Sequence, residues 1–213
     1  MIIDHTNPLY QRAYNSMKDG RYTGAYYYSE EIVKNIIPNV KTDRNWVTIN
    51  QVGQGYSHSI VFIHNNVNPG LYDWLKDFDD LILVCGVPST CAKVKHLGKP
   101  IYLPLSVDVK YVEQFKREKK YKRAFAGRIT KTRNTNFQYD VPCIYGKPRE
   151  ELLPAIAEYE QIYAVGRTAI EAKILDCEIL TYDPRFPDPS FWRIIDNLEA
   201  ARMLQELIDE IDK

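Results

Sequence analysis

The sequence has few cysteines and no long apolar run. Its four cysteines, Cys85, Cys91, Cys143 and Cys177, have none of the spacings typical of zinc sites or redox dithiols, and we interpret them as reduced core residues. The N-terminus lacks a basic region followed by an apolar stretch, and no run approaches the length of a membrane span. We therefore expect a cytoplasmic protein without a transmembrane segment.

The sequence also lacks an excess of charge of either sign. Lys+Arg and Asp+Glu number 28 each, so the formal net charge is zero. Such a balance gives no argument for nucleic acid, for a membrane surface or for an acidic partner. The local basic run 116–123 is interpreted as a solvated, linker-like surface. The length, 213 residues, suffices for one large domain or two small ones.

What the sequence does contain is a regular alternation of strand and helix patterns. In the first half, strands are predicted at 46–50, 59–64, 80–85 and 101–103, with helices at 29–37, 71–78 and 87–97. In the second half, strands are predicted at 124–126, 141–144, 161–165 and 178–180, with helices at 109–115, 149–159 and 168–175. This alternation predicts an α/β protein of two Rossmann-like βαβ halves with parallel sheets, residues 1–107 and 108–213. An amphipathic helix over 197–211 ends the second half.

The segment Gly166-Arg167-Thr168-Ala169-Ile170-Glu171-Ala172 follows an apolar strand and opens a helix. A glycine at such a turn lets the backbone approach a ligand closely, and the start of the helix presents unpaired N–H groups to it. Arg167 and Thr168 add a charge and a hydroxyl, and Glu171 could accept hydrogen bonds from a ribose. The pattern suits a nucleotide diphosphate. A tight turn before an ordinary core helix explains it equally well.

A second segment, residues 122–131, is predicted to be a strand that ends in Gly127 and Arg128, with Lys131 three residues later. Two cations just beyond a strand end are well placed to neutralise a pyrophosphate. The alternative is a solvated basic loop, because other lysines and arginines lie nearby in the sequence.

Taken together in the order in which they occur in the chain, the two segments resemble the C-terminal half of GT-B glycosyltransferases. Within that fold, the resemblance is to retaining enzymes similar to glycosyltransferase family 4. The resemblance covers roughly residues 80–185 and includes 100–108, which is similar to the interdomain strand of that family. It implies that Gly127, Arg128 and Lys131 hold the diphosphate of a nucleotide sugar, without a metal ion. Gly166, Arg167 and Thr168 would close around that diphosphate, and Glu171 would bind the ribose.

The GT-B resemblance also places the end of the strand 59–64 at an interdomain cleft. His64 would then lie where it could touch the donor or the acceptor sugar. The alternative is a strand-end histidine that bonds a loop carbonyl. With this assignment, the chain is expected to move a sugar from a nucleotide diphosphate sugar to an acceptor that the sequence does not identify.

The sequence departs from the family pattern in three places, one of which is the lack of the glycine-rich loop that the family often has near the N-terminus. Tyr163 stands eight positions before Glu171, in the region where many relatives have a sugar-contacting glutamate, and Ser106 stands where glycine is usual. Two further hypotheses therefore remain open. The chain could bind a nucleotide or a sugar nucleotide without turnover, or it could use the GT-B scaffold only for contacts with other proteins.

Overall fold

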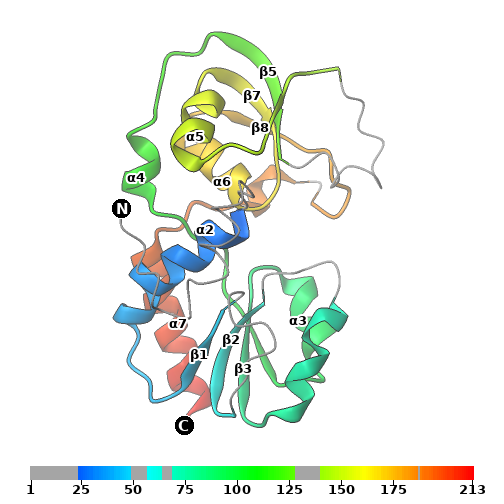
Figure 1. Ribbon diagram of the computed structural model, residues 1–213, viewed down its shortest axis with the longest axis vertical. Coiled ribbons are helices and arrows are strands. Elements are labelled where there is room, and N and C mark those ends of the chain that lie inside the picture. Colours follow the sequence, from blue (N-terminus) through cyan, green and yellow to red (C-terminus); the bar gives the residue numbers. More distant parts are fainter. Residues whose placement is uncertain (1–23, 49–56, 64–68, 128–139, 187) are drawn as a thin grey trace. The chain divides into compact units, whose positions relative to one another are not determined.

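The computed structural model describes residues 24–48, 57–63, 69–127, 140–186 and 188–213. The chain divides into two compact units (Figure 1). Unit 1 consists of Met1–Pro104 together with Asn197–Lys213, and unit 2 consists of Leu105–Asp196.

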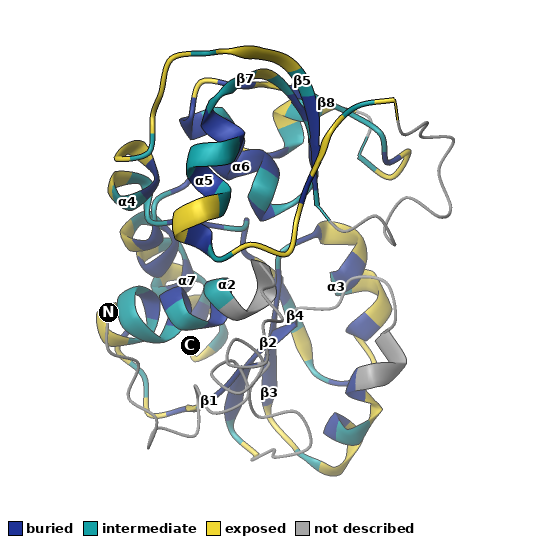
Figure 2. Cartoon of the chain, turned by 45° about the horizontal axis from the view of Figure 1, so that its top comes forward, coloured by how far each residue is buried: buried dark blue, intermediate teal, exposed yellow. Residues whose placement is uncertain are grey.

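Unit 1 is built on a four-stranded parallel sheet with the strand order β1-β2-β3-β4. The strands are β1 (Asn45–Val47), β2 (Ser59–Ile63), β3 (Leu81–Cys85) and β4 (Lys99–Tyr102). The helical elements are α2 (Gly24–Glu31), the π-helix η1 (Ile32–Ile36), the 3-10 helices η2 (Ile37–Asn39) and η4 (Pro69–Asp77), and α3 (Pro88–Val94). All residues of β2 and β3 are buried (Figure 2), as expected for the central strands of a parallel sheet.

The C-terminal helix α7 (Asn197–Ile211) belongs to unit 1. Its apolar stripe buries Ala200, Ala201, Leu204 and Ile208, and the helix packs against η1 and η2. This corrects the predicted division at residue 107, which assigned 108–213 as a whole to the second half. An amphipathic pattern indicates that a helix has a face to bury, but it does not indicate which core covers that face.

Unit 2 has a second four-stranded parallel sheet, with the strand order β6-β5-β7-β8. Its strands are β5 (Tyr121–Ala126), β6 (Cys143–Ile144), β7 (Tyr159–Tyr163) and β8 (Glu178–Leu180). Its helices are α4 (Val109–Glu113), α5 (Arg149–Ala157), α6 (Arg167–Ile174) and the 3-10 helix η6 (Pro189–Phe191). The core lies between the sheet and these helices, with Ala124, Ile162, Leu153 and Ile170 among its fully buried members.

The structure confirms an α/β protein with two parallel sheets, although several predicted boundaries differ. The helix predicted over 29–37 has its described start at Gly24, so Ser29 is a buried residue inside α2. The basic run 116–123 continues into β5, which begins at Tyr121. Lys122 pairs with Glu160 of β7, and Lys120 pairs with Glu158. These opposite-charge pairs lie at the exposed start of β5, where each contributes little to stability.

Candidate functional site

The strand order of unit 2 creates a topological switch point between β5 and β7. The chain leaves β5 to form β6 on one side and returns to form β7 on the other, and both neighbours are parallel to β5. Phe125 pairs with Tyr163 near the carboxyl ends of β5 and β7. Ligands of open parallel sheets bind beyond the carboxyl ends of the strands at such a point. The fold therefore brings the two turns predicted from the sequence, at Gly127 and at Gly166, to the same edge.

Gly166 occupies a backbone conformation that other residues avoid. Its φ is 67° and its ψ is −143°, a combination largely restricted to glycine. Its carbonyl accepts hydrogen bonds from the N–H groups of Ala169 and Ile170, so it is the N-cap of α6. Space does not require a glycine here, because the nearest atom to an added Cβ would be a Leu105 methyl at 4.0 Å. The glycine is therefore explained by the sharp turn that points the start of α6 at the strand edge.

Gly127 also has a positive φ, of 150°, and directly follows β5. An added Cβ would meet the Phe125 ring at 3.6 Å, an ordinary contact. As at Gly166, the backbone conformation rather than the available space favours glycine. Both predicted turns thus combine a strand end with a glycine conformation.

A buried ion-pair cluster lies at the starts of α5 and α6. Oε1 of Glu171 is 3.0 Å from Nη2 of Arg149 and 3.4 Å from Nε of Arg167. All three residues are only 5–6% exposed. Arg149 is the first residue of α5 and Arg167 the first residue of α6, so both cations stand at helix N-termini that follow strand ends. We call these three residues the arginine–glutamate cluster.

Tyr111 of α4 packs its ring against Arg149 of this cluster. The guanidinium carbon of Arg149 lies 4.8 Å from the centre of the Tyr111 ring, in a cation–π arrangement. The Tyr111 hydroxyl donates a hydrogen bond to Glu150 at 3.2 Å. Burial, followed by the nearby Glu150 charge, raises the pKa of Tyr111 to about 12, so the phenol remains a donor at neutral pH. The ring therefore supports Arg149 from one side while Glu171 holds it from another.

Sequence reasoning did not predict Arg149 as a site residue. Its signal was available, because an arginine follows the predicted strand 141–144 at the start of a helix, as Arg167 follows the next strand. Glu171 was assigned to a ribose. In the structure its carboxylate is buried between two guanidinium groups, and ribose binding stays a prediction. Thr168, in the first turn of α6, is half-buried.

Tyr163 lies on β7, eight positions before Glu171. Its hydroxyl accepts a long hydrogen bond of 3.5 Å from Arg123 of β5. The Arg123 guanidinium also lies 5.7 Å from the Tyr163 ring centre. Three further predicted site residues, His64, Arg128 and Lys131, lie outside the described residues. Gly127, Gly166, Arg167, Thr168 and Glu171 all belong to unit 2, and the two glycines follow adjacent parallel strands.

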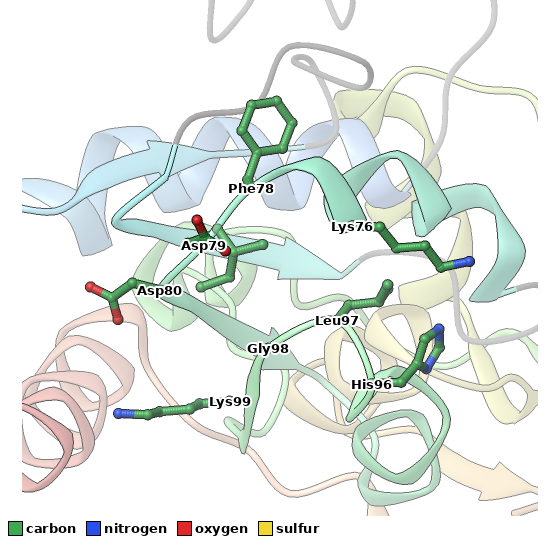
Figure 3. A pocket seen from close by; sticks show the side chains of 9 residues that line it. Lys76, Phe78, Asp79, Asp80, His96, Leu97, Gly98 and Lys99 are labelled. Atoms are coloured by element: carbon green, nitrogen blue, oxygen red, sulfur yellow. The ribbon is translucent and has the colours of Figure 1, made fainter.

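Unit 1 contains a cavity of about 430 Å³ at the opposite, amino edge of its sheet (Figure 3). Asp79 and Asp80 come just before β3, and Gly98 lies just before β4. Lys76, His96 and Lys99 also line the cavity. Ligands of parallel sheets are expected beyond the carboxyl edge, so this cavity is not the site predicted from the sequence.

Within the described ranges, no group of three or more histidine, cysteine, aspartate or glutamate side chains could hold a metal ion. Among the helices that the structure describes, none is long and apolar enough to cross a membrane. No protein-family model, curated protein or solved structure matches the chain.

Proposed function

We propose that the chain binds a nucleotide diphosphate sugar on unit 2 and transfers its sugar to an acceptor. The observation that carries this proposal is the switch point between β5 and β7. Gly127 and the Gly166 turn stand there at the ends of two adjacent parallel strands. A diphosphate suits this edge because the start of α6 directs N–H groups toward it.

The resemblance to GT-B glycosyltransferases assigns the remaining roles. Arg128 follows Gly127 directly in the sequence, Lys131 comes three residues later, and both would neutralise the diphosphate. During transfer, negative charge grows on the leaving diphosphate, and cations already in place there stabilise the transition state. Removing one such group typically lowers the rate about 100- to 1000-fold. Arg167, fixed by Glu171, would add a positive charge at the same edge.

A second candidate function is binding of a sugar nucleotide without transfer. Tyr163 favours it, because a phenol that contacts Arg123 stands in the region where the family has a sugar-contacting carboxylate. The burial of Glu171 between two arginines favours it as well, since this carboxylate already has strong partners.

Thermal unfolding with a panel of nucleoside diphosphates and their sugar conjugates tests the proposal. A ligand at a hundredfold excess over its dissociation constant stabilises the folded state by about 2.7 kcal/mol. We expect one nucleotide to raise the midpoint of the native protein and to have little effect on Arg128→Ala. If no member of the panel raises the midpoint, the proposed function is wrong.

Two glycine variants form a matched pair for the same assay. Gly166 and Gly146 have nearly equal φ angles, 67° and 69°, so alanine strains the backbone at both positions. Gly146 follows β6, whereas Gly166 follows β7, on the other side of β5. Gly166→Ala should lose the ligand-induced shift and Gly146→Ala should keep it, each measured against its own ligand-free midpoint.

Release of the free sugar from the bound donor separates the two candidate functions. A transferase without its acceptor often passes the sugar slowly to water, which yields the nucleoside diphosphate and the free sugar. Binding without any release over long incubation would favour the second candidate.

A further inference from the structure

Five ionisable side chains form a continuous network at the amino edge of the sheet of unit 1. Nδ1 of His58 lies 2.6 Å from Oδ2 of Asp80, and Nε2 of His58 lies 3.2 Å from Oδ1 of Asp43. The same Asp80 oxygen lies 3.1 Å from Nη1 of Arg44, and Nη2 of Arg44 lies 2.6 Å from Oδ1 of Asp212. We call His58, Asp43, Asp80, Arg44 and Asp212 the edge network.

Arg44 connects the end of the chain to the sheet. Its side chain is only 4% exposed, and it contacts both carboxylate oxygens of Asp212, which directly follows α7. Its Nη1 also donates to the Asp80 carbonyl at 3.1 Å. Asp80 thus sets the position of Arg44 through two of its oxygens. Arg44 in turn holds the C-terminal end of α7.

His58 and Asp80 both have left-handed backbone conformations, with φ angles of 56° and 52°. Such angles are uncommon for residues other than glycine and persist where the surroundings enforce them. The His58 N–H donates to the Asp79 carbonyl at 3.0 Å, and the Ser59 N–H donates to the Asp80 carbonyl at 3.2 Å. The side-chain contact between His58 and Asp80 therefore joins two strained positions at the starts of β2 and β3.

We propose that His58 is a pH-sensitive latch that holds the C-terminal end of α7 on the sheet of unit 1. The argument rests on the number of N–H groups in the ring. A protonated imidazole has two, so it can donate to Asp80 and to Asp43 at once. A neutral imidazole has one, so one of these two contacts is lost. Arg44 is then the only cation that compensates the negative charge of Asp80 within the edge network. Because Arg44 also binds Asp212, its position relative to Asp212 changes.

The direction of the pH effect follows from the charges around His58. Its hydrogen bond to Asp80, and then that to Asp43, raises the pKa of His58 above its ordinary value, while the nearby Arg44 opposes this. Hydrogen bonds from His58 lower the pKa of both aspartates. Further charged groups among the described residues near Asp80 include Asp79, beside it in the sequence, and Lys99 of β4, which extends toward the same side as Asp80 (Figure 3).

A group whose folded-state pKa is raised stabilises the folded state fully below its unfolded pKa, about 6.5 for histidine. This stabilisation is lost as the pH rises through the raised pKa. The latch is therefore closed in mildly acidic solution and opens as the pH increases. Asp43 and Asp80 keep their charge over this range, because their pKa values are lowered.

Hydrogen exchange of the full-length protein between about pH 5 and about pH 8, corrected for the intrinsic rate, tests the latch. We expect protection of the last turns of α7 to fall several-fold over this range, while protection of β3 stays constant. His58→Asn removes the titrating group, and asparagine tolerates the left-handed conformation. In this variant, protection of α7 should not depend on pH.

His96→Gln is the control, because His96 is another exposed histidine of unit 1 and lies 3.9 Å from Asp73. It should leave the pH dependence unchanged. Titration of the His58 imidazole by NMR adds an independent readout, with an expected pKa above the ordinary value for histidine. The proposal would be overturned if protection of α7 did not change with pH, or if His58→Asn showed the same pH dependence as the native protein. The test does not involve nucleotides, so its outcome is independent of the proposed function.

Discussion

Arg149 and Glu171 form a buried ion pair, with Nη2 and Oε1 3.0 Å apart, that joins the first residue of α5 to the middle of α6. The same carboxylate oxygen lies 3.4 Å from Nε of Arg167. A carboxylate with these partners fixes the two helix starts relative to the switch point between β5 and β7. The edge that we propose as the ligand site therefore has a preorganised, positively charged margin.

Replacing Glu171 with alanine should destabilise the protein strongly. Removing one member of a buried ion pair typically costs about 3–5 kcal/mol, because the remaining charge has lost its compensation in a dry environment. Urea unfolding measures this loss as a lower transition midpoint. The control is Glu151→Ala, since Glu151 forms a 3.6 Å pair with Lys147 and its side chain is 61% exposed. If Glu171→Ala were as stable as this control, water would be compensating the charges of Arg149 and Arg167 in place of the carboxylate.

Lys119 binds the C-terminal ends of two helices at once. Its Nζ donates to the Ala157 carbonyl at 3.0 Å, at the end of α5, and to the Leu175 carbonyl at 2.6 Å, just after α6. Lys119→Met keeps much of the aliphatic stem and removes these donors. We expect a loss of about 1–3 kcal/mol, the cost of leaving buried acceptors unsatisfied.

Lys122→Met is the matched control for Lys119→Met, because Lys122 is 71% exposed and forms a surface pair with Glu160. Surface substitutions of this kind change stability by about 0.5 kcal/mol or less. Equal effects of the two variants on the thermal midpoint would exclude a special role for Lys119.

The sequence predicted the strands and most helices because each type of element has a recognisable local pattern of apolar residues. Uninterrupted apolar residues identified β2 and β3, and the amphipathic stripe of α7 gave its bounds, Asn197–Ile211, as the structure has them. The partner of α7 was not predictable in this way. Its stripe packs against η1, far away in the sequence, and Arg44 holds its end through Asp212.

The candidate site was predictable only in part, for the same reason. Gly127 and Gly166 are recognisable as strand-end turns, and parallel pairing of β5 with β7 brings them to one edge. The contact between Arg149 and Glu171 depends on the packing of α5 against α6, which no local pattern encodes. The sequence motifs therefore pointed to the carboxyl edge of β5 and β7, but not to Arg149 as a partner of Glu171.

Gly98 is expected to tolerate no side chain. An alanine Cβ at this position would lie 2.6 Å from the Leu81 carbonyl oxygen and 2.9 Å from the Leu81 Cβ. The oxygen belongs to the backbone of β3, which cannot move without disturbing its neighbours in the sheet. Gly98→Ala should therefore destabilise unit 1 by about 1–3 kcal/mol, the usual cost of overpacking, and lower the thermal midpoint. An unchanged midpoint would mean that the approach of β4 to β3 adjusts freely.

The cysteines should differ widely in their reactivity toward an alkylating reagent. Cys143 is exposed, whereas Cys85 and Cys177 are buried. Burial raises the pKa of Cys177, although its contact with Lys119 at 3.2 Å opposes this, and burial also raises the pKa of Cys85. Because the thiolate is the reactive form, both buried residues should react slowly at neutral pH.

Mass spectrometry of peptides from the native protein, taken at successive times of alkylation, should show modification of Cys143 first. Cys177 should follow only when unit 2 opens. Lys119→Met tests the link between this order and the two helix ends that Lys119 binds, because looser ends of α5 and α6 expose Cys177 more often. Cys177 should therefore react faster in this variant than in Lys122→Met. Unchanged kinetics at Cys177 would show that the Lys119 contacts do not limit access to the core of unit 2.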